Sequence, residues 1–419
     1  MSSSFLKNKL LLSVGSYTFV NVINKGIPFL LIPILTHYLS PEDMGILTNI
    51  ESLITILIAV IGINISTAVT RQYVKTDVIL KNYVSTSLRV VFVSFLLITL
   101  LFSSLAGIIA DFTAIPISVI YVLSIYALLD NFVEILLAIW RMEDQPFQYG
   151  AVRIARTVLE VSLSLTLVVG YQYNWFGRFI GIYSSGILIT LLAIFILYKK
   201  NVLSGKFDKN YKTHFLNFGL PLIPHTISGV LILYSDKIII TKMIGIEENG
   251  LYSVAFTIGM AISLLQNSFN QAWVPWLFKK LALNSSDEDR KLVRITYLYM
   301  LAMIGFVLVL WLITPIIYQF IDADFSEGMG VVAIIGLGFG FNGMYKMMVN
   351  YLFYAEKTKV ISSITIVLAV VNIVLSVLLI PKYGIVGPAY ASALTFFMQF
   401  LITWYFSNKY HPMPWFKNK

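Results

Sequence analysis

Long apolar stretches follow one another along the whole chain, separated by short polar segments. A helix needs roughly 20 mostly apolar residues to cross the hydrocarbon core of a bilayer, so the pattern predicts about twelve spans. They are expected near Leu10 to Thr36, Met44 to Ser66, Val84 to Ile109, Pro116 to Trp140, Ala151 to Tyr171, Gly177 to Tyr198, Phe215 to Ile240, Gly250 to Ala272, Ile295 to Phe320, Val331 to Tyr354, Val360 to Ile380 and Ile385 to Phe406.

Composition agrees with this pattern. Apolar residues make up 58% of the 419 positions and charged residues 12%, and the mean hydropathy is +0.81. These values exceed those of water-soluble folds. The sequence therefore predicts an all-α polytopic membrane protein.

The basic residues predict its orientation, because loops that face the cytoplasm are enriched in Lys and Arg. Most of the 30 Lys and Arg residues precede the first span, follow the last one or lie in or beside the even-numbered connections. The largest groups are Lys199, Lys200, Lys206, Lys209 and Lys212, and Lys279, Lys280, Arg290, Lys291 and Arg294. We therefore expect both termini to be cytoplasmic.

The same distribution explains the net charge of +9, since the excess orients the helices and meets anionic headgroups. A nucleic-acid partner is therefore not expected. The chain has no cysteine, which excludes thiol catalysis and thiolate metal sites, and its four histidines are scattered. No catalytic residue, metal site or cofactor is predicted.

An internal repeat organises the spans. The stretch Ile32 to Leu47 aligns with Lys237 to Leu251, and each copy reads helix, short acidic turn, glycine, helix. A second match places Leu163 to Gly177 on Leu375 to Gly387. Six helices are thus followed by six related ones.

Because six is even, both halves enter the membrane from the same side, as parallel repeats related by a pseudo-two-fold axis along the membrane normal. We expect a six-helix lobe over residues 1–200, a cytoplasmic linker over 201–214 and a second six-helix lobe over 215–419. Such repeats are typical of transporters that work by alternating access.

Charges inside the spans are the candidate functional residues, because a charge at the helix centre costs about 2.5 to 3.5 kcal/mol on insertion scales. Lys25 is expected to face a cavity, or else to pair with an acid such as Glu51. Asp236 and Lys237 are adjacent, about 100° apart on a helix, so each needs its own partner. Lys237 is either a cavity cation or a helix anchor that snorkels outward.

Further polar faces carry weaker candidates. Asp130 and Glu134 lie four residues apart and could bind a coupling ion, H+ or Na+, or pair with Lys346. Lys346 shares one helical face with Asn342 and Asn350, which must meet protein or water. An amide-rich face with Gln266 and Asn270 could bind sugar hydroxyls or join helices. The face of Arg153, Arg156 and Glu160 is either a cytoplasmic gate or a set of pairs within one helix, and Arg89 and Arg178 are expected to snorkel.

Three segments carry a family resemblance: Gly26 to Leu47, Phe218 to Gly259 and Asn372 to Phe397. Their most specific features are Pro221 and Pro224, the Asp236-Lys237 dipeptide followed by Gly245 and Gly250-Leu251-Tyr252, and the hairpin Asn372 to Gly387. In these features the chain resembles the Wzx-type polysaccharide flippases of the multidrug/oligosaccharidyl-lipid/polysaccharide exporter (MOP) superfamily.

The resemblance implies a MATE-like fold and a function. A member would move undecaprenyl-diphosphate-linked oligosaccharide units, such as O-antigen repeats, from the cytoplasmic to the periplasmic leaflet of a bacterial inner membrane. Lys25, Glu51, Asp236 and Lys237 would lie on the helices that line the cavity. The implied partners are the lipid-linked oligosaccharide, membrane lipids, a polysaccharide polymerase and a chain-length regulator.

Two other functions remain open at this stage. A multidrug or cation antiporter of the same superfamily would favour an acidic cavity, whereas Lys25, Lys237 and Lys346 suit an anionic substrate. A membrane glycosyltransferase or polymerase would need a sizeable outer loop, and every outer loop expected here is short.

Overall fold

The protein was analysed as a computed structural model, which describes residues 26–27, 29–73, 75, 78–283 and 285–415. Within these residues the secondary structure is helical throughout, without strands. The described residues divide into two compact units, one comprising 26–27 and 38–230 and the other 29–37 and 231–415. The lobe boundary expected at 201–214 stays a prediction.

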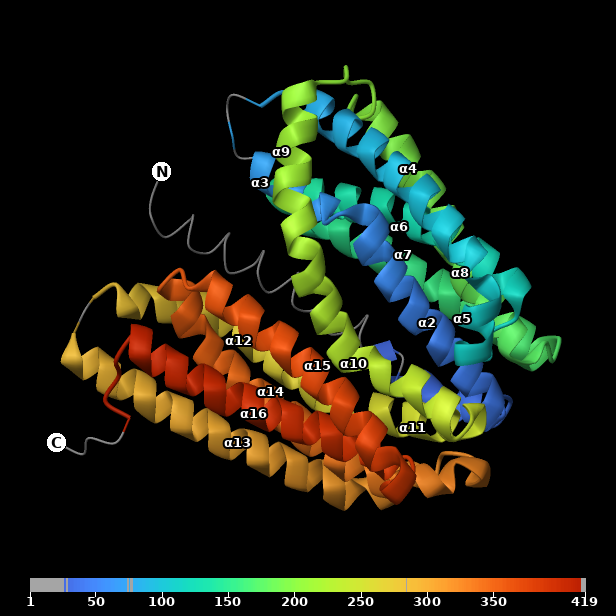
Figure 1. Cartoon of the computed structure of the whole chain (residues 1–419), viewed down its shortest axis with the longest axis vertical. Helices are drawn as coiled ribbons and strands as arrows, with labels where there is room; N and C mark the ends of the chain where they lie inside the picture. Colours follow the sequence, from blue (N-terminus) through green and yellow to red (C-terminus); the bar gives the residue numbers. More distant parts are fainter. Residues whose placement is uncertain (1–25, 28, 74, 76–77, 284, 416–419) are drawn as a thin grey trace. The chain divides into compact units, whose positions relative to one another are not determined.

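The first unit surrounds one buried helix. α6 (Ile117–Met142) packs against α2 (Pro41–Gly62), α4 (Leu80–Ser104) and α8 (Asn174–Lys199), as Figure 1 shows. The remaining elements are α3 (Ile65–Tyr73), α5 (Ala106–Thr113), α7 (Pro146–Leu165), the π-helical turn η1 (Thr166–Gly170) and α9 (Lys209–Gly219).

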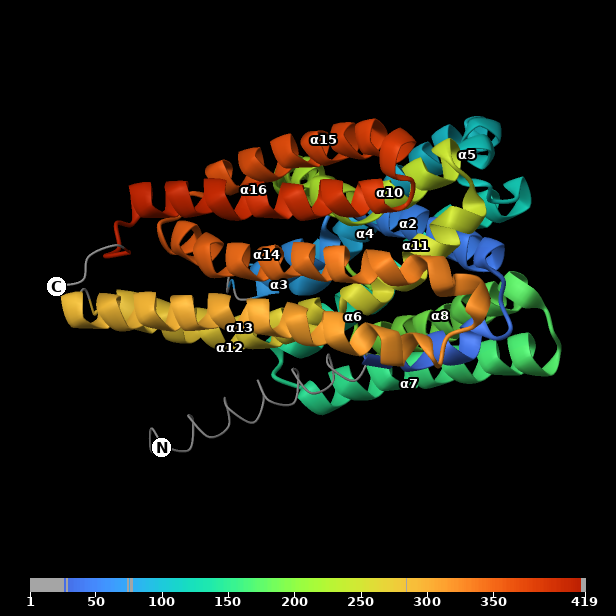
Figure 2. The same cartoon turned by 90° about the horizontal axis from the view of Figure 1, so that it is seen from below.

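The second unit repeats this plan. α14 (Met329–Tyr354) packs against α16 (Val386–Tyr410), α13 (Ser286–Tyr318), α11 (Ile246–Gly259) and α12 (Ala261–Leu281), and Figure 2 shows α13, α14 and α16 running side by side. η2 (Leu220–Leu222) and the start of α10 (Ile223–Met243) continue α9 and belong to the first unit, whereas α10 from Leu231 on belongs to the second. The other elements of the second unit are η3 (Ala323–Gly328) and α15 (Thr358–Tyr383).

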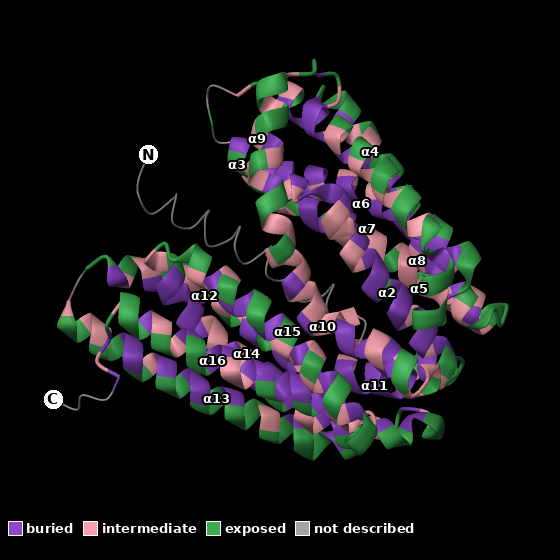
Figure 3. Ribbon diagram, in the orientation of Figure 1, coloured by how far each residue is buried: buried purple, intermediate pink, exposed green. Residues whose placement is uncertain are grey.

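Burial distinguishes the central helices from the outer ones. Figure 3 shows α6 and α14 largely buried, whereas α4 and α13 expose much of their length. Exposed leucines and valines are stable in this setting because lipid is as apolar as they are. α6 and α14 are each the fourth expected span of their half. The central buried helix of each unit therefore occupies the same position in the predicted repeat.

Nine helices of the described residues are long and apolar enough to cross a membrane. Most of the expected span Leu10 to Thr36 lies outside the described residues. The spans expected at Ala151 to Tyr171 and Gly250 to Ala272 correspond to helices that are shorter or more polar: α7 with η1, and α11 with the start of α12. The all-helical membrane fold is confirmed, while the number of twelve spans stays a prediction.

Backbone breaks explain where observed helices depart from expected ones. The span expected at Phe215 to Ile240 contains the 3-10 turn η2 around Pro221, because proline lacks the N–H that an α-helix needs. The span expected at Met44 to Ser66 ends at Gly62, where Ile63 and Asn64 adopt left-handed backbone angles of φ 48° and 56°.

Gly387 lets the last two helices approach closely, and it provides a test of the fold. A Cβ at this position would lie 2.7 Å from the carbonyl carbon of Leu379 and 2.8 Å from the nitrogen of Ile380, both backbone atoms. We expect Gly387→Ala to destabilise the hairpin of α15 and α16 by about 1 to 3 kcal/mol, as overpacking does. Thermal unfolding in detergent measures this, with Gly330→Ala as the control because a Cβ there meets no atom within 4 Å.

Candidate functional site

A buried carboxylate forms the centre of a polar cluster in the second unit. Asp236 lies on α10, has 1% of its surface exposed and accepts hydrogen bonds from three hydroxyl groups. Ser376 on α15 donates over 2.7 Å, Ser392 on α16 over 2.6 Å and Tyr252 on α11 over 3.0 Å. One charged side chain thus joins four helices.

Two neighbours extend this cluster. The Asn372 amide on α15 donates to the Ser392 hydroxyl over 3.2 Å and accepts from the Ser235 hydroxyl over 3.5 Å. Asn372 and Ser376 are one turn apart and fully buried. A buried charge is tolerated only when its lone pairs are satisfied, and here oxygen-bearing side chains supply the donors. The prediction that Asp236 has partners other than its neighbour is confirmed.

Lys237 is also almost fully buried, with 4% of its surface exposed. Its ammonium nitrogen lies 4.6 Å from the ring centre of Tyr234 and 4.5 Å from that of Phe256. Aromatic faces attract a cation, and the attraction is stronger in a site shielded from water. The side chain is therefore held between α10 and α11 by aromatic contacts.

A second polar seam joins α12 and α14. The Lys346 ammonium donates to the Asn267 side-chain oxygen over 2.6 Å, and one turn further along Asn350 donates to Asn270 over 2.8 Å. Gln266 donates to the backbone oxygen of Phe339 over 3.3 Å. The two amide faces predicted separately from the sequence therefore meet each other, and the half-buried Asn342 extends the α14 face by one turn.

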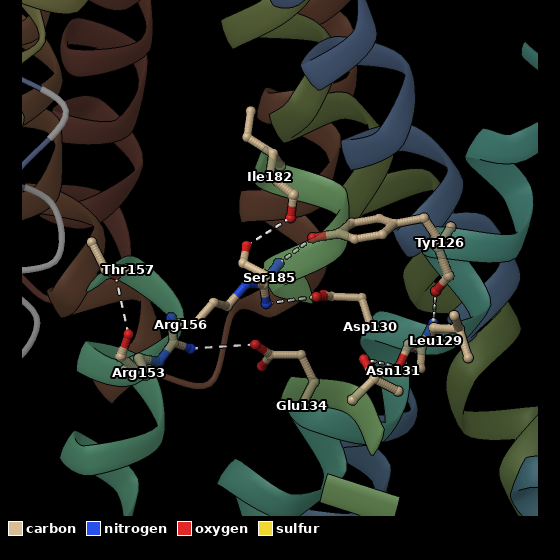
Figure 4. Close-up of polar contacts among 12 residues, drawn as sticks. Tyr126, Leu129, Asp130, Asn131, Glu134, Arg153, Arg156, Thr157, Ile182 and Ser185 are labelled. Carbon is tan, nitrogen blue, oxygen red and sulfur yellow. Dashed lines mark hydrogen bonds and ion pairs between the residues drawn. The ribbon is translucent and has the colours of Figure 1, made fainter. Parts of the chain in front are cut away.

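The two candidate acids of α6, Asp130 and Glu134, are paired with arginines. In Figure 4, Asp130 and Glu134 project from α6 toward Arg156 and Arg153 of α7. Asp130 accepts from Arg156 over 2.7 Å, and Glu134 accepts from Arg153 over 3.3 Å. Arg156 also donates to the Tyr126 hydroxyl. The two acids therefore have arginine partners within the first unit.

A third pair continues the row. Arg178 of α8 donates to Glu160 of α7 over 2.7 Å and to the Ser164 hydroxyl over 2.8 Å. α7 is therefore joined to α6 by its arginines and to α8 by its glutamate. The sequence had suggested pairs within α7 and a snorkelling Arg178, but the charged side chains connect different helices. The remaining candidate, Glu51, lies exposed on α2, and Lys25 lies outside the described residues.

Comparison with known proteins identifies the chain. Residues 10–281 match the model of the polysaccharide biosynthesis protein family. The chain belongs to this family. One relative is Lsg locus putative protein 1 of Haemophilus influenzae. Its sequence is 24% identical to this chain over 394 residues, which cover 90% of this chain and 94% of that protein. The capsular polysaccharide biosynthesis protein CapF of Staphylococcus aureus is 21% identical over 94% of this chain and 98% of its own.

Two solved structures share the fold of this polysaccharide biosynthesis protein. An inward-facing multidrug resistance MATE family transporter of the MOP superfamily has a TM-score of 0.76 at 13% identity, with 94% of each chain covered. The lipid II flippase MurJ in an inward closed conformation has a TM-score of 0.72 at 16% identity, covering 97% of this chain and 88% of MurJ. The predicted fold class and family are thereby confirmed.

The sequence singled out some partners of Asp236 without assigning them. Tyr252 and the hairpin from Asn372 were noted only as marks of this family. Small hydroxyl residues are common in membrane helices, so Ser376 and Ser392 gave no signal of their own. The i,i+4 spacing of Asp130 and Glu134 was a usable signal, because Arg153 and Arg156 repeat almost the same spacing on the next helix.

Proposed function

We propose that this protein is a flippase. It moves polyprenyl-diphosphate-linked oligosaccharide units, of the undecaprenyl type, from the cytoplasmic leaflet to the opposite leaflet of a bacterial inner membrane. In this proposal it is a transporter that works by alternating access and not an enzyme, and it needs no cofactor. It hands its substrate to a polysaccharide polymerase and a chain-length regulator.

The combination of family and fold carries the proposal. The chain belongs to a polysaccharide biosynthesis family, and its fold is shared with a lipid flippase and a multidrug transporter. Surface polysaccharide units are large and polar, so a lipid-linked unit cannot cross a hydrocarbon core unaided. A helical membrane protein in such a pathway is best explained by the step that carries the unit across.

We assign Lys25, Lys237 and Lys346 to recognition of the diphosphate or of acidic sugars. Lys346 fits this role by its surroundings, because its Asn267 contact belongs to a seam of amides that can also bind sugar hydroxyls. Gln266, Asn270, Asn342 and Asn350 complete the polar surface proposed for the glycan. Lys237, held between two rings, is assigned to the same recognition role.

Asp236 is the stronger of the proposed coupling sites. Its contacts are oxygen atoms of hydroxyl groups, and carboxylate with hydroxyl oxygens suits a proton or a hard cation such as Na+. Asp130 and Glu134 already have arginine partners, which neutralise them. We therefore assign those two acids, and Glu51 with them, to gating movements of the first unit.

A multidrug antiporter is the second candidate, since the MATE transporter has the higher TM-score of the two structures described above. The proposal of a flippase rests instead on the family and on the intramembrane lysines. A glycosyltransferase or polymerase is less favoured, because the predicted outer loops are short.

Deletion of the gene in its host tests the function directly. We expect complete lipid-linked repeat units to accumulate on the cytoplasmic leaflet, and the wild-type gene to remove them. Lipid extraction with mass spectrometry identifies the glycan, and enzymatic accessibility reports the leaflet. A normal lipid pool together with new sensitivity to cationic drugs would assign the protein to the multidrug branch.

Neutralising the lysines tests the site. We expect Lys25→Ala, Lys237→Ala and Lys346→Met each to reduce complementation of the deletion by at least about tenfold, which corresponds to a loss of 1.4 kcal/mol. Lys242→Ala is the matched control, because this exposed lysine lies on the same helix as Lys237. Equal export by the three variants and the control, at equal membrane levels, would reject the assignment.

A further inference from the structure

Two apolar grooves meet at one arginine in the first unit. The first, of about 470 Å³, lies between α4 and the segment from Phe207 to Leu220. The second, of about 450 Å³, lies between α4, Phe132 of α6 and Leu203. Arg89 and Val93 line both grooves, so they stand on the strip of α4 that separates them.

The first groove is charged at one end and apolar along the rest. Arg89, Phe207 and Lys212 line it near the start of α4 and α9. Val93, Leu97 and Ile98 continue it along α4, and Leu216 and Leu220 continue it along the opposite wall. At 1.5 Å per residue, the strip from Arg89 to Ile98 is roughly 13 Å long, close to half of a hydrocarbon core of about 30 Å. Its length therefore fits one leaflet.

A fixed loop builds the charged end. The segment after α8 is joined to α4 by hydrogen bonds from the Gly205 nitrogen to the Ser85 hydroxyl (2.9 Å), from the Lys206 nitrogen to the Asn82 side chain (2.9 Å) and from the Asp208 nitrogen to the Thr86 hydroxyl (3.1 Å). A Cβ on Gly205 would lie 2.1 Å from the backbone oxygen of Lys81, so only glycine permits this approach. The wall next to Arg89 is thus preformed.

The cations at this end have capacity for a further partner. Arg89 donates one hydrogen bond, to the Gly205 oxygen over 3.4 Å, and its guanidinium lies 5.9 Å from the Phe207 ring centre. A guanidinium carries five N–H donors. Among the described residues, no ion pair involves Arg89 or Lys212. The nearby acid, Asp208, is engaged as the N-cap of α9, where it accepts from the nitrogens of Asn210 and Tyr211.

We propose that Arg89 and Lys212 bind the phosphate of one anionic glycerophospholipid, one acyl chain of which lies along the first groove beside α4. A cationic end that continues into an apolar channel matches a phosphate with its acyl chain, and arginine binds phosphate through two parallel N–H donors. Neighbouring Lys206 adds to the local positive potential. The site is independent of the proposed transport function.

Lipid titration of the purified full-length protein tests the site. Native mass spectrometry compares phosphatidylglycerol with phosphatidylcholine of the same acyl chains, added to delipidated protein. We expect one phosphatidylglycerol to bind preferentially, and its affinity to fall about fivefold for each cation removed in Arg89→Gln, Lys212→Gln and the double variant. Lys209→Gln, an exposed lysine outside both grooves, should bind as the wild type does.

Two further variants distinguish loss of the lipid site from misfolding and from a general loss of positive charge. Arg89→Lys keeps a charge and should retain part of the affinity, which guards against misfolding as the cause. Val93→Trp should fill both grooves and weaken binding although every charge remains. Equal affinity for the two lipids, unchanged binding by the double variant, or an equal loss in Lys209→Gln would each overturn the proposal, the last by showing attraction to the basic loop as a whole.

Discussion

Replacing Asp236 by leucine is expected to destabilise the protein by about 3 to 5 kcal/mol, because each buried donor left without an acceptor costs about 1 to 3 kcal/mol. The substitution leaves the hydroxyls of Tyr252, Ser376 and Ser392 without their acceptor, and each of them is buried. Four helices lose their common contact at the same time. Thermal unfolding in detergent, followed by tryptophan fluorescence, measures the effect.

Asp236→Asn separates stability from transport. Asparagine has nearly the same shape and its side-chain oxygen still accepts from hydroxyls, so the unfolding temperature should stay close to that of the wild type. Transport should nevertheless fail, because a neutral amide cannot take up a proton or balance a cation. Ser235→Ala is the control, since its hydroxyl makes one long contact within the part of the chain that the structure describes, to Asn372 over 3.5 Å. Full transport by Asp236→Asn would contradict the coupling role and leave Asp236 as a structural anchor.

The fold was predictable because the hydrocarbon core restricts the sequence of any segment that crosses it. A spanning helix must satisfy its backbone internally and must be apolar over its length, so α6, α14, α15 and α16 were recognised to within a few residues. Breaks were less predictable. Ile63 carries no sequence signal for a left-handed backbone. Gly259 precedes the division between α11 and α12 at Met260, but glycines are frequent in these spans and do not single out a break.

The candidate site was only partly predictable, for a related reason. Position in an apolar run identified Asp130, Glu134, Asp236 and Lys346 as residues that need partners, because burial of a charge is costly wherever the helix lies. Which partner each has depends on how helices pack, and that is a non-local property. Asp236 and Ser392 are 156 positions apart in the chain, and nothing in the local pattern connects them.

Replacing Arg156 is expected to cause the second large loss of stability. Its guanidinium bonds Asp130 over 2.7 Å and also contacts Tyr126, and only 10% of the Asp130 side chain is exposed. Arg156→Met would leave a carboxylate unpaired among apolar helices, at a cost of about 3 to 5 kcal/mol. Arg153→Met should cost about 1 kcal/mol or less, because its pair with Glu134 is longer, 3.3 Å, and both side chains are about a third exposed.

A double-mutant cycle separates two explanations. Either the Asp130–Arg156 pair makes a net contribution to stability, or the loss in a single variant comes from the charge that is left buried without a partner. Asp130→Leu combined with Arg156→Met removes both charges, so the desolvation cost disappears with the attraction, and the double variant should be more stable than either single one. Thermal unfolding of the four proteins gives the coupling energy. Transport by the double variant is a separate test. If the double variant transports normally, the pair is structural.

If it is stable but inactive, the charges between α6 and α7 are needed for movement during the transport cycle. A double variant no more stable than Arg156→Met would contradict the pairing itself.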